Sequence, residues 1–150
     1  MCGICGELRV DGQAADMGAV KRMLSKLERR GPDHEGHYAQ GAVALGHRRL
    51  SVIDLSSASN QPWIDEVLGL ALVFNGAIYN YKELRAELIA QGFSFVSDGD
   101  TEVVLKAYAA WGESFATRLQ GMFAIAVWDQ KRRQLVLVRD RFGIKPCYYS

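Results

Sequence analysis

The chain begins with MCGICGELRV (residues 1–10), which we expect to form a short first strand. Cys2 stands one residue behind the initiator methionine, and a small second residue permits removal of that methionine. The exposed cysteine then carries a free α-amino group. A thiol with a reference pKa of about 8.5 needs a base, and an α-amine with a pKa of about 7.7 to 8.0 suits that task near neutral pH. Nucleophile and base can therefore belong to one residue.

Cys2 also has two other interpretations. A second-position cysteine is commonly just a small residue entering a strand. Cys2 and Cys5 also form a C-x-x-C pair, but a redox pair is expected after a strand, and no chain precedes it here. In a strand over residues 2–10, a spacing of three places the two thiols on opposite faces, so we expect Cys5 to pack in the core. With Cys147, the cysteines number three, which argues against a disulfide framework.

Apolar periodicity predicts alternating helices and strands over the rest of the chain. Helices are predicted over 16–30, over 80–92 with an Asn80 cap, and from Asp100 or Thr101 to Gly112. Strands are predicted over 37–45, 68–74, 93–97, 122–128 and 135–139, and a last one begins near Pro146, with turns at Gly41 and 56–61. This order favours an α+β fold, with helices packed on mostly antiparallel sheets.

Composition indicates one ordinary globular domain over residues 1–150 and excludes several functional classes. The formal net charge is +1, which gives no electrostatic reason to expect a nucleic acid partner. No apolar run approaches the length of a membrane span, and the first thirty residues lack the pattern of a secretory signal. We therefore expect a cytoplasmic protein that binds no membrane.

Several ordered blocks of sequence resemble the glutaminase domain of asparagine synthetases, a branch of the class II glutamine amidotransferases. The blocks are MCGICG (1–6), RGPDHEG (30–36), HRRLSVIDLS (47–56), FNGAIYNYKELRAEL (74–88), SDGDTEVVLKAYAAWG (97–112), LQGMFAIAVWD (119–129) and VRDRFGIKP (138–146). The resemblance implies an N-terminal nucleophile (Ntn) hydrolase fold, a four-layer αββα sandwich with mostly antiparallel sheets. It also implies that Cys2 attacks the side-chain amide of L-glutamine, with its α-amine relaying the proton, and that a thioester forms before glutamate and ammonia are released.

Acyl transfer requires hydrogen-bond donors where the oxyanion develops. The Asn75 side-chain amide and the Gly76 backbone N–H suit this role; without the resemblance, Asn-Gly would be interpreted as a turn. Arg49 can bind the substrate carboxylate in a bidentate manner, and Asp100 can pair with its ammonium group. The structural alternatives are a surface arginine and a helix cap, and Asp100 can serve in both ways. The segment Leu50, Ser51, Val52 and Ile53 is expected to complete the glutamine pocket.

Ala77 departs from the pattern of the resembled family. The family commonly has glutamate there, as NGEIYN, whereas this chain has NGAIYN. A methyl group cannot accept a hydrogen bond from the substrate ammonium, so we expect weaker or differently tuned glutamine binding. Cys147 is a second departure and is expected to be a buried thiol. The three histidines form no ligand set with recognisable spacing, so no metal site is predicted, and His47 is expected to support the glutamine loop.

The resemblance also implies a longer enzyme. The chain has neither a Walker-type phosphate loop nor the Ser-Gly-Gly-x-Asp-Ser loop of the family's synthetase domain. We therefore expect a C-terminally truncated glutaminase domain that needs no cofactor. ATP and Mg would be bound only by the missing synthetase domain of the same chain, which would amidate aspartate. Another carboxylate such as a small peptide, a non-catalytic regulatory module and a homodimer stay open.

Overall fold

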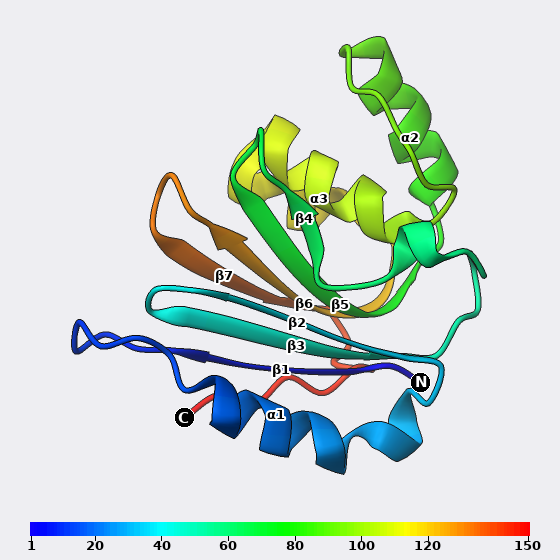
Figure 1. Ribbon diagram of the computed structural model, residues 1–150. Helices are drawn as coiled ribbons and strands as arrows, with labels where there is room; N and C mark the ends of the chain where they lie inside the picture. Colours follow the sequence, from blue (N-terminus) through cyan, green and yellow to red (C-terminus); the bar gives the residue numbers. More distant parts are fainter.

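The computed structural model describes residues 1–150 and has two antiparallel sheets packed face to face between layers of helices (Figure 1). The first sheet has the order β1-β3-β2, with β1 over Gly3–Leu8, β2 over His34–Gln40 and β3 over Val43–Arg49. The second has the order β4-β5-β6-β7, with β4 over Trp63–Asp65, β5 over Leu70–Ile78, β6 over Gly121–Asp129 and β7 over Gln134–Arg139. The helices and the two sheets confirm the predicted αββα arrangement.

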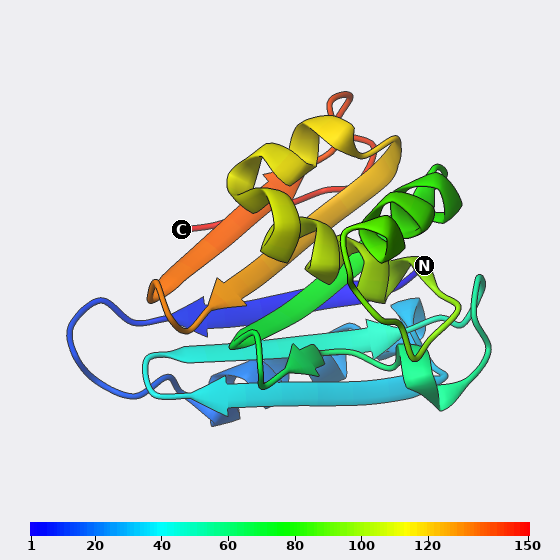
Figure 2. The same cartoon turned by 90° about the horizontal axis from the view of Figure 1, so that it is seen from above.

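Helices cover the outer face of each sheet. Helix α1 (Met17–Lys26) lies under the first sheet, and α2 (Tyr81–Ala90) and α3 (Asp100–Trp111) lie over the second (Figures 1 and 2). A short α4 (Phe115–Arg118) follows α3, and single 3₁₀ turns lie at Glu28–Arg30, Ser57–Ser59 and Gly112–Ser114. None of these helices combines the length and the apolar character that crossing a bilayer requires.

Strand alternation divides the apolar side chains among three cores. In β5, Leu70, Leu72 and Phe74 face α2 and α3 and belong to a cluster of 16 buried residues. Ala71 and Val73, which alternate with them, pack against β3 in a cluster between the two sheets. A third, small cluster lies between α1 and the first sheet. Each sheet is therefore apolar on both faces.

The cluster between the sheets becomes polar at one end of the sandwich. On β3, the residues that face the second sheet run from Val43 and Leu45 to His47 and Arg49. On β5, the residues that face the first sheet run from Ala71 and Val73 to Asn75 and Ala77. At this end of the sandwich, the side chains that β3 and β5 direct toward each other are therefore polar or small instead of apolar. A buried polar site can form there.

Most predicted elements are confirmed, with altered bounds. The strand predicted over 37–45 is a hairpin, because Gly41 adopts φ +55 between β2 and β3. The central strand β5 extends to Ile78, so Asn75 and Gly76 lie within it, and the helix predicted over 16–30 ends at Lys26 before a 3₁₀ turn. The three-residue strand β4 was not predicted.

Two predicted strands are wrong. Residues 93–97 form no strand, because the buried Glu102 carboxylate accepts hydrogen bonds from the backbone N–H groups of Val96 and Ser97. The strand expected near Pro146 is also absent, and the Asp140 carboxylate accepts the backbone N–H groups of Ile144 and Lys145 just before it. At residues 96 and 97 a carboxylate therefore takes the backbone donors that a sheet would use.

The predicted cap residues have other partners. The Asn80 side chain precedes α2 but makes no capping bond; its amide bonds to the backbone of Arg118 and Gln120, which ties α2 to the start of β6. The N-cap of α3 is Gly99, and Asp100 is the first residue of that helix. Cys147 is half-buried and not fully buried as expected.

Phe115 provides a test of the largest core. Its side chain is fully buried and packs edge-on against Tyr108, with 5.6 Å between ring centroids. Phe115→Ala should lower the free energy of unfolding by about 3 to 5 kcal/mol, because it removes apolar contacts and leaves a cavity. Urea denaturation measures this loss. Phe142→Ala, at a ring that is 86% exposed, is the control and should change stability little; equal losses would contradict the assigned core.

Candidate active site

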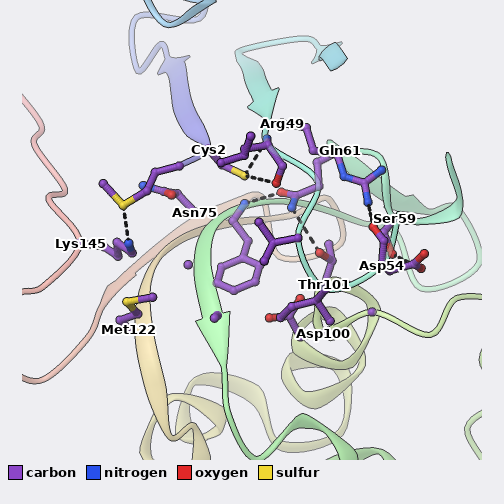
Figure 3. Close-up of a pocket in the computed structure, with 18 residues that line it drawn as sticks. Cys2, Arg49, Asp54, Ser59, Gln61, Asn75, Asp100, Thr101, Met122 and Lys145 are labelled. Carbon is purple, nitrogen blue, oxygen red and sulfur yellow. Dashed lines mark hydrogen bonds between the residues drawn. The ribbon is translucent and has the colours of Figure 1, made fainter. Parts of the chain in front are cut away.

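A pocket of about 160 Å³ lies at the polar end of the sandwich (Figure 3). It is lined by the N-terminus, the end of β3 with the loop that follows, the second half of β5 and the start of α3. Segments far apart in the sequence therefore meet in one cavity. Nine of the ten predicted site residues line it: Cys2, Arg49, Leu50, Val52, Ile53, Asn75, Gly76, Ala77 and Asp100.

The tenth predicted residue, Ser51, does not line the pocket. Its backbone N–H donates to the Asp33 carboxylate at 2.8 Å, on the outer side of the loop. Its neighbours Leu50, Val52 and Ile53 line the pocket, so Ser51 anchors the loop to Asp33 instead of lining the pocket.

Cys2 enters the pocket from the strand end of β1. Ile4 packs in the cluster between the sheets, on the same face as Cys2, whereas Cys5 packs in the cluster under α1, so the prediction that the two thiols lie on opposite faces is confirmed. The Cys2 thiol donates to the Leu50 carbonyl at 3.6 Å and accepts from the Leu50 N–H at 3.3 Å. The Arg30 side chain donates to the Cys2 carbonyl at 3.3 Å and fixes the backbone next to the thiol.

The thiol of Cys5 lies in an environment that makes it unreactive. Its Sγ lies 3.9 Å from the Val20 carbonyl of α1. Burial raises the pKa of the Cys5 thiol to about 11, and the nearby Glu35 carboxylate adds to the effect. A thiol that stays protonated at neutral pH is a poor nucleophile. Only Cys2 of the C-x-x-C pair is thus placed for chemistry.

The second half of β5 has a free edge that points into the site. Strand β4 pairs with β5 only from Leu70 to Leu72. The Tyr79 N–H, just after β5, donates to the Gln120 carbonyl, just before β6. In the antiparallel pair of β5 and β6, the N–H and carbonyl groups of the odd-numbered β5 residues therefore point toward β6. The even-numbered residues therefore direct their N–H and carbonyl groups to the free edge.

Side chains satisfy this edge in place of a neighbouring strand. The Phe74 N–H donates to Gln61 Oε1 at 2.6 Å, the His47 Nε2–H donates to the Phe74 carbonyl at 3.1 Å, and the Ile78 N–H donates to Asp100 Oδ2 at 3.0 Å. Gly76 lies between them, and its N–H is directed to the same edge of a strand that lines the pocket. His47 therefore supports β5 and not the loop after β3.

Asn75 supplies a second donor beside Gly76. Its side chain is only 4% exposed, lines the pocket and makes no hydrogen bond within the protein. At position 76, an added Cβ would lie 2.0 Å from the Met122 carbonyl of the neighbouring strand, so only glycine fits. The interpretation of Asn-Gly as a turn is wrong because both residues lie within β5. Two donors without partners thus line the same pocket as the thiol of Cys2.

Asp100 closes the pocket from the start of α3. Its carboxylate is only 6% exposed, and burial raises its pKa to about 6, although the N–H groups of Ile78 and of the helix start favour the charged form. No cationic side chain forms an ion pair with it. A buried carboxylate without a cation suits the binding of an ammonium group.

Arg49 lies across the pocket and holds the loop that follows β3. Its guanidinium group donates to the carbonyls of Asp54 and Ser56 and to the Asn60 side chain. A guanidinium group has five N–H donors, so two remain beyond these three bonds. Arg49 is therefore a buried loop anchor, not a surface arginine, and it keeps enough donors for one carboxylate.

Several lining residues were missed by sequence reasoning. Gln61 is 6% exposed and bridges β5 and α3; it lies in a stretch predicted only as a turn. Lys145 is 4% exposed and its ammonium group lies 2.8 Å from Met1 Sδ, with no carboxylate paired to it (Figure 3). No local pattern distinguishes either residue, because each is brought to the pocket by a loop without regular structure.

Comparison with known proteins agrees with this geometry. The chain matches the glutamine amidotransferase domain over residues 1–150. It is 42% identical over 153 residues to asparagine synthetase (glutamine-hydrolyzing) 1 of Bacillus subtilis, and 41% identical over 162 residues to amidase chry2 of Gibberella zeae. Both alignments cover the whole chain but 24% of the relative, so the chain spans about a quarter of the length of these curated relatives.

A solved structure shows the same fold. Glutamine phosphoribosylpyrophosphate amidotransferase from Bacillus subtilis superposes with a TM-score of 0.59 and 24% identity, over 72% of this chain and 25% of that one. Two sheets between helical layers, with a cysteine leading into the first strand, define an Ntn-type amidotransferase fold. The chain belongs to the glutamine amidotransferase family and is an enzyme domain, and it is similar over its whole length to part of the asparagine synthetases.

We expect the ionised, buried Asp100 carboxylate to lower the free energy of unfolding at neutral pH. Because its pKa in the folded state, about 6, exceeds the ordinary 3.8, its ionisation destabilises the fold as the pH rises through 6. Asp100→Asn should therefore be more stable than the wild type at pH 7, by up to about 3 kcal/mol, and no more stable near pH 4. Urea denaturation at the two pH values measures this difference.

Asp54 is the matched control for this prediction. Hydrogen bonds from Ser59 and Ser56 lower the pKa of its carboxyl to about 2, so its ionised form stabilises the fold. Asp54→Asn should then be less stable than the wild type at pH 7. If the two substitutions change stability in the same direction at pH 7, the assigned environment of Asp100 is wrong.

Proposed function

We propose that this domain hydrolyses the side-chain amide of L-glutamine through a thioester at Cys2. The observation that carries the proposal is the convergence, in one pocket, of the Cys2 thiol, two donors without partners on β5 and a buried carboxylate on α3. These are the groups that acyl transfer from a free amino acid requires. The 42% identity to a glutamine-hydrolyzing asparagine synthetase supports the same choice of substrate.

The nucleophile requires removal of Met1. Met1 lines the pocket, and its departure leaves the α-amine on Cys2 itself. This amine takes the thiol proton while Sγ forms a bond to the amide carbon. The same proton passes to the leaving nitrogen as the C–N bond breaks, and ammonia departs. Water, activated by the amine, then attacks the thioester, which releases glutamate and restores the thiol.

The oxyanion of each tetrahedral intermediate is stabilised by the Asn75 side-chain amide and the Gly76 N–H. Removing one such donor in other enzymes typically costs about 2.7 to 4 kcal/mol of transition-state stabilisation. The remaining two N–H groups of Arg49 bind the α-carboxylate of glutamine, and the Asp100 carboxylate binds its α-ammonium group. Main-chain groups of the loop after β3 complete the contacts, with Leu50 next to the thiol.

Glutamate release from glutamine is the direct test. The wild type, with Met1 removal checked by intact mass, should release glutamate, and Cys2→Ala should abolish release because it removes the nucleophile. Cys5→Ala is the matched control and should keep most of the activity, since Cys5 faces α1. The glutamine-like electrophile diazo-oxo-norleucine should modify Cys2 alone. Glutamate release that survives Cys2→Ala would overturn the mechanism.

We expect Ala77 to weaken or alter glutamine binding, because its methyl group cannot accept a hydrogen bond from the substrate ammonium. It lines the pocket one residue before Ile78, whose N–H contacts the Asp100 carboxylate. Ala77→Glu should lower KM for glutamine, because a second carboxylate can accept a hydrogen bond from the substrate ammonium. Steady-state kinetics measure the change, and Ala77→Gln, of equal size but neutral, should lower KM less. An unchanged KM in Ala77→Glu would contradict this role.

We further propose that the ammonia is passed to an ATP-dependent synthetase domain of the same full-length chain, located in the cytoplasm. The relatives are about four times as long as this chain, which supports a second domain that holds ATP and Mg. Aspartate is the favoured acceptor because three relatives from Bacillus subtilis are named asparagine synthetases. A second candidate is another carboxylate such as a small peptide, since a relative of 41% identity is named an amidase and not an asparagine synthetase.

Acceptor assays distinguish these candidates. The full-length protein, supplied with glutamine, ATP and Mg, should convert aspartate to asparagine if aspartate is the acceptor. ATP turnover that responds to another carboxylate but not to aspartate would favour the second candidate. A full-length protein that retains Met1 and releases no glutamate would indicate a regulatory module.

A further inference from the structure

Gln61 joins the two elements that carry the opposite ends of the site. Its Oε1 accepts the Phe74 N–H at 2.6 Å, one residue before Asn75, and its Nε2 donates to Thr101 Oγ1 at 3.2 Å, one residue after Asp100 (Figure 3). The side chain is 6% exposed and lines the pocket. Both ends of one amide are therefore used, one on β5 and one on α3.

The backbone of Gln61 is fixed as well. Its carbonyl lies so close to β2 that a Cβ added at Gly36 would be 2.0 Å from the oxygen. The loop before it also abuts the start of α3, where a Cβ at Gly99 would lie 2.5 Å from Ser59 Oγ. Gln61 thus has little freedom to follow a shift of either element. Because two hydrogen bonds hold its side chain and close packing holds its backbone, Gln61 keeps β5 and α3 at a fixed spacing.

Gln61 affects the oxyanion donors through its hydrogen bond to Phe74, the residue before Asn75. Strand β4 pairs with β5 only as far as Leu72, so the Phe74 N–H donates to the Gln61 side chain and not to a neighbouring strand. The His47 imidazole holds the carbonyl of the same residue. Together they set the position of β5 immediately before its two free donors.

We infer that Gln61 is a positioning residue, which sets the spacing between the oxyanion donors on β5 and the Asp100 carboxylate on α3. The inference rests on the proposed glutamine hydrolysis. Glutamine bound by its α-ammonium group at Asp100 reaches the thiol with its amide carbon only if this spacing matches its length. Misplacement of the reacting group by about 1 Å can cost on the order of 100-fold in rate.

Substitution of Gln61 tests the inference in the full-length protein. Gln61→Met keeps the length of the side chain but removes both hydrogen bonds. It should lower kcat for glutamate release by about 10- to 100-fold and change KM for glutamine less than threefold, since the groups that bind the α-amino acid end remain. Gln40→Met is the control: Gln40 accepts bonds from Tyr38 and Trp128 away from the pocket, and its loss should leave kcat within twofold.

Two alkylating reagents separate positioning from a general loss of structure. Diazo-oxo-norleucine uses the α-amino acid contacts, so its reaction with Cys2 should slow in Gln61→Met in parallel with kcat. Iodoacetamide needs neither Asp100 nor the oxyanion donors, so its reaction with Cys2 should stay within twofold of the wild type. Equal slowing of both reagents would indicate damage to Cys2 and overturn the inference.

Thr101→Val covers the case in which Gln61→Met does not fold. It removes only the hydroxyl at the α3 end of the bridge, should lower kcat in the same way, and should add little in the double variant because both residues act through one bridge. Thr101→Ser, which keeps the hydroxyl, should restore kcat. Additive losses, or a kcat within threefold of wild type in Gln61→Met or Thr101→Val, would overturn the inference. A wild type that releases no glutamate would instead contradict the proposed function.

Discussion

The edge of β5 between Phe74 and Ile78 lacks a neighbouring strand, and the arrangement of the whole site depends on it. Buried backbone groups need hydrogen-bond partners, and β4 stops short of this stretch. Side chains from a loop, from β3 and from α3 fill most of the positions: Gln61, His47 and Asp100. The N–H of Gly76 is the donor left for a ligand. Because this edge has no neighbouring strand, side chains from three elements come together to bond to it, and the Gly76 N–H stays free to bind a substrate.

The polar end of the sandwich is costly to build. The Asp100 carboxylate is buried without a cation, and burial lowers the pKa of His47 to about 4, so its ring is neutral. Because the His47 Nε2–H donates to a carbonyl, its Nδ1 is an acceptor, and it is buried without a partner. Large apolar clusters on both faces of the second sheet offset these costs. Such unfavourable groups are expected where a protein binds or transforms a substrate.

Sequence reasoning succeeded where the evidence is local. Continuous apolar runs located β5 and β6, and the resemblance of the surrounding sequence to a known family pointed to the N-terminal cysteine and the Asn-Gly pair as candidates for chemistry. It failed where tertiary contacts override local preference. Residues 93–97 alternate like a strand, but the buried Glu102 carboxylate takes their N–H groups. Ser51 was placed in the pocket with its neighbours, and Asp33 turns it away.

The sequence by itself determined the class of fold, proposed the nucleophile and predicted nine of the eighteen residues that line the pocket, because these depend on periodicity and on residue types at fixed positions. Only the tertiary structure decided which groups are free to act. Arg49 has two N–H donors left because three are bonded to a loop, and Gly76 has a free N–H because β4 is short. Gln61 acquires its role from partners 13 and 40 residues away. Hydrogen-bond satisfaction is a property of the folded neighbourhood, so no local pattern could reveal it.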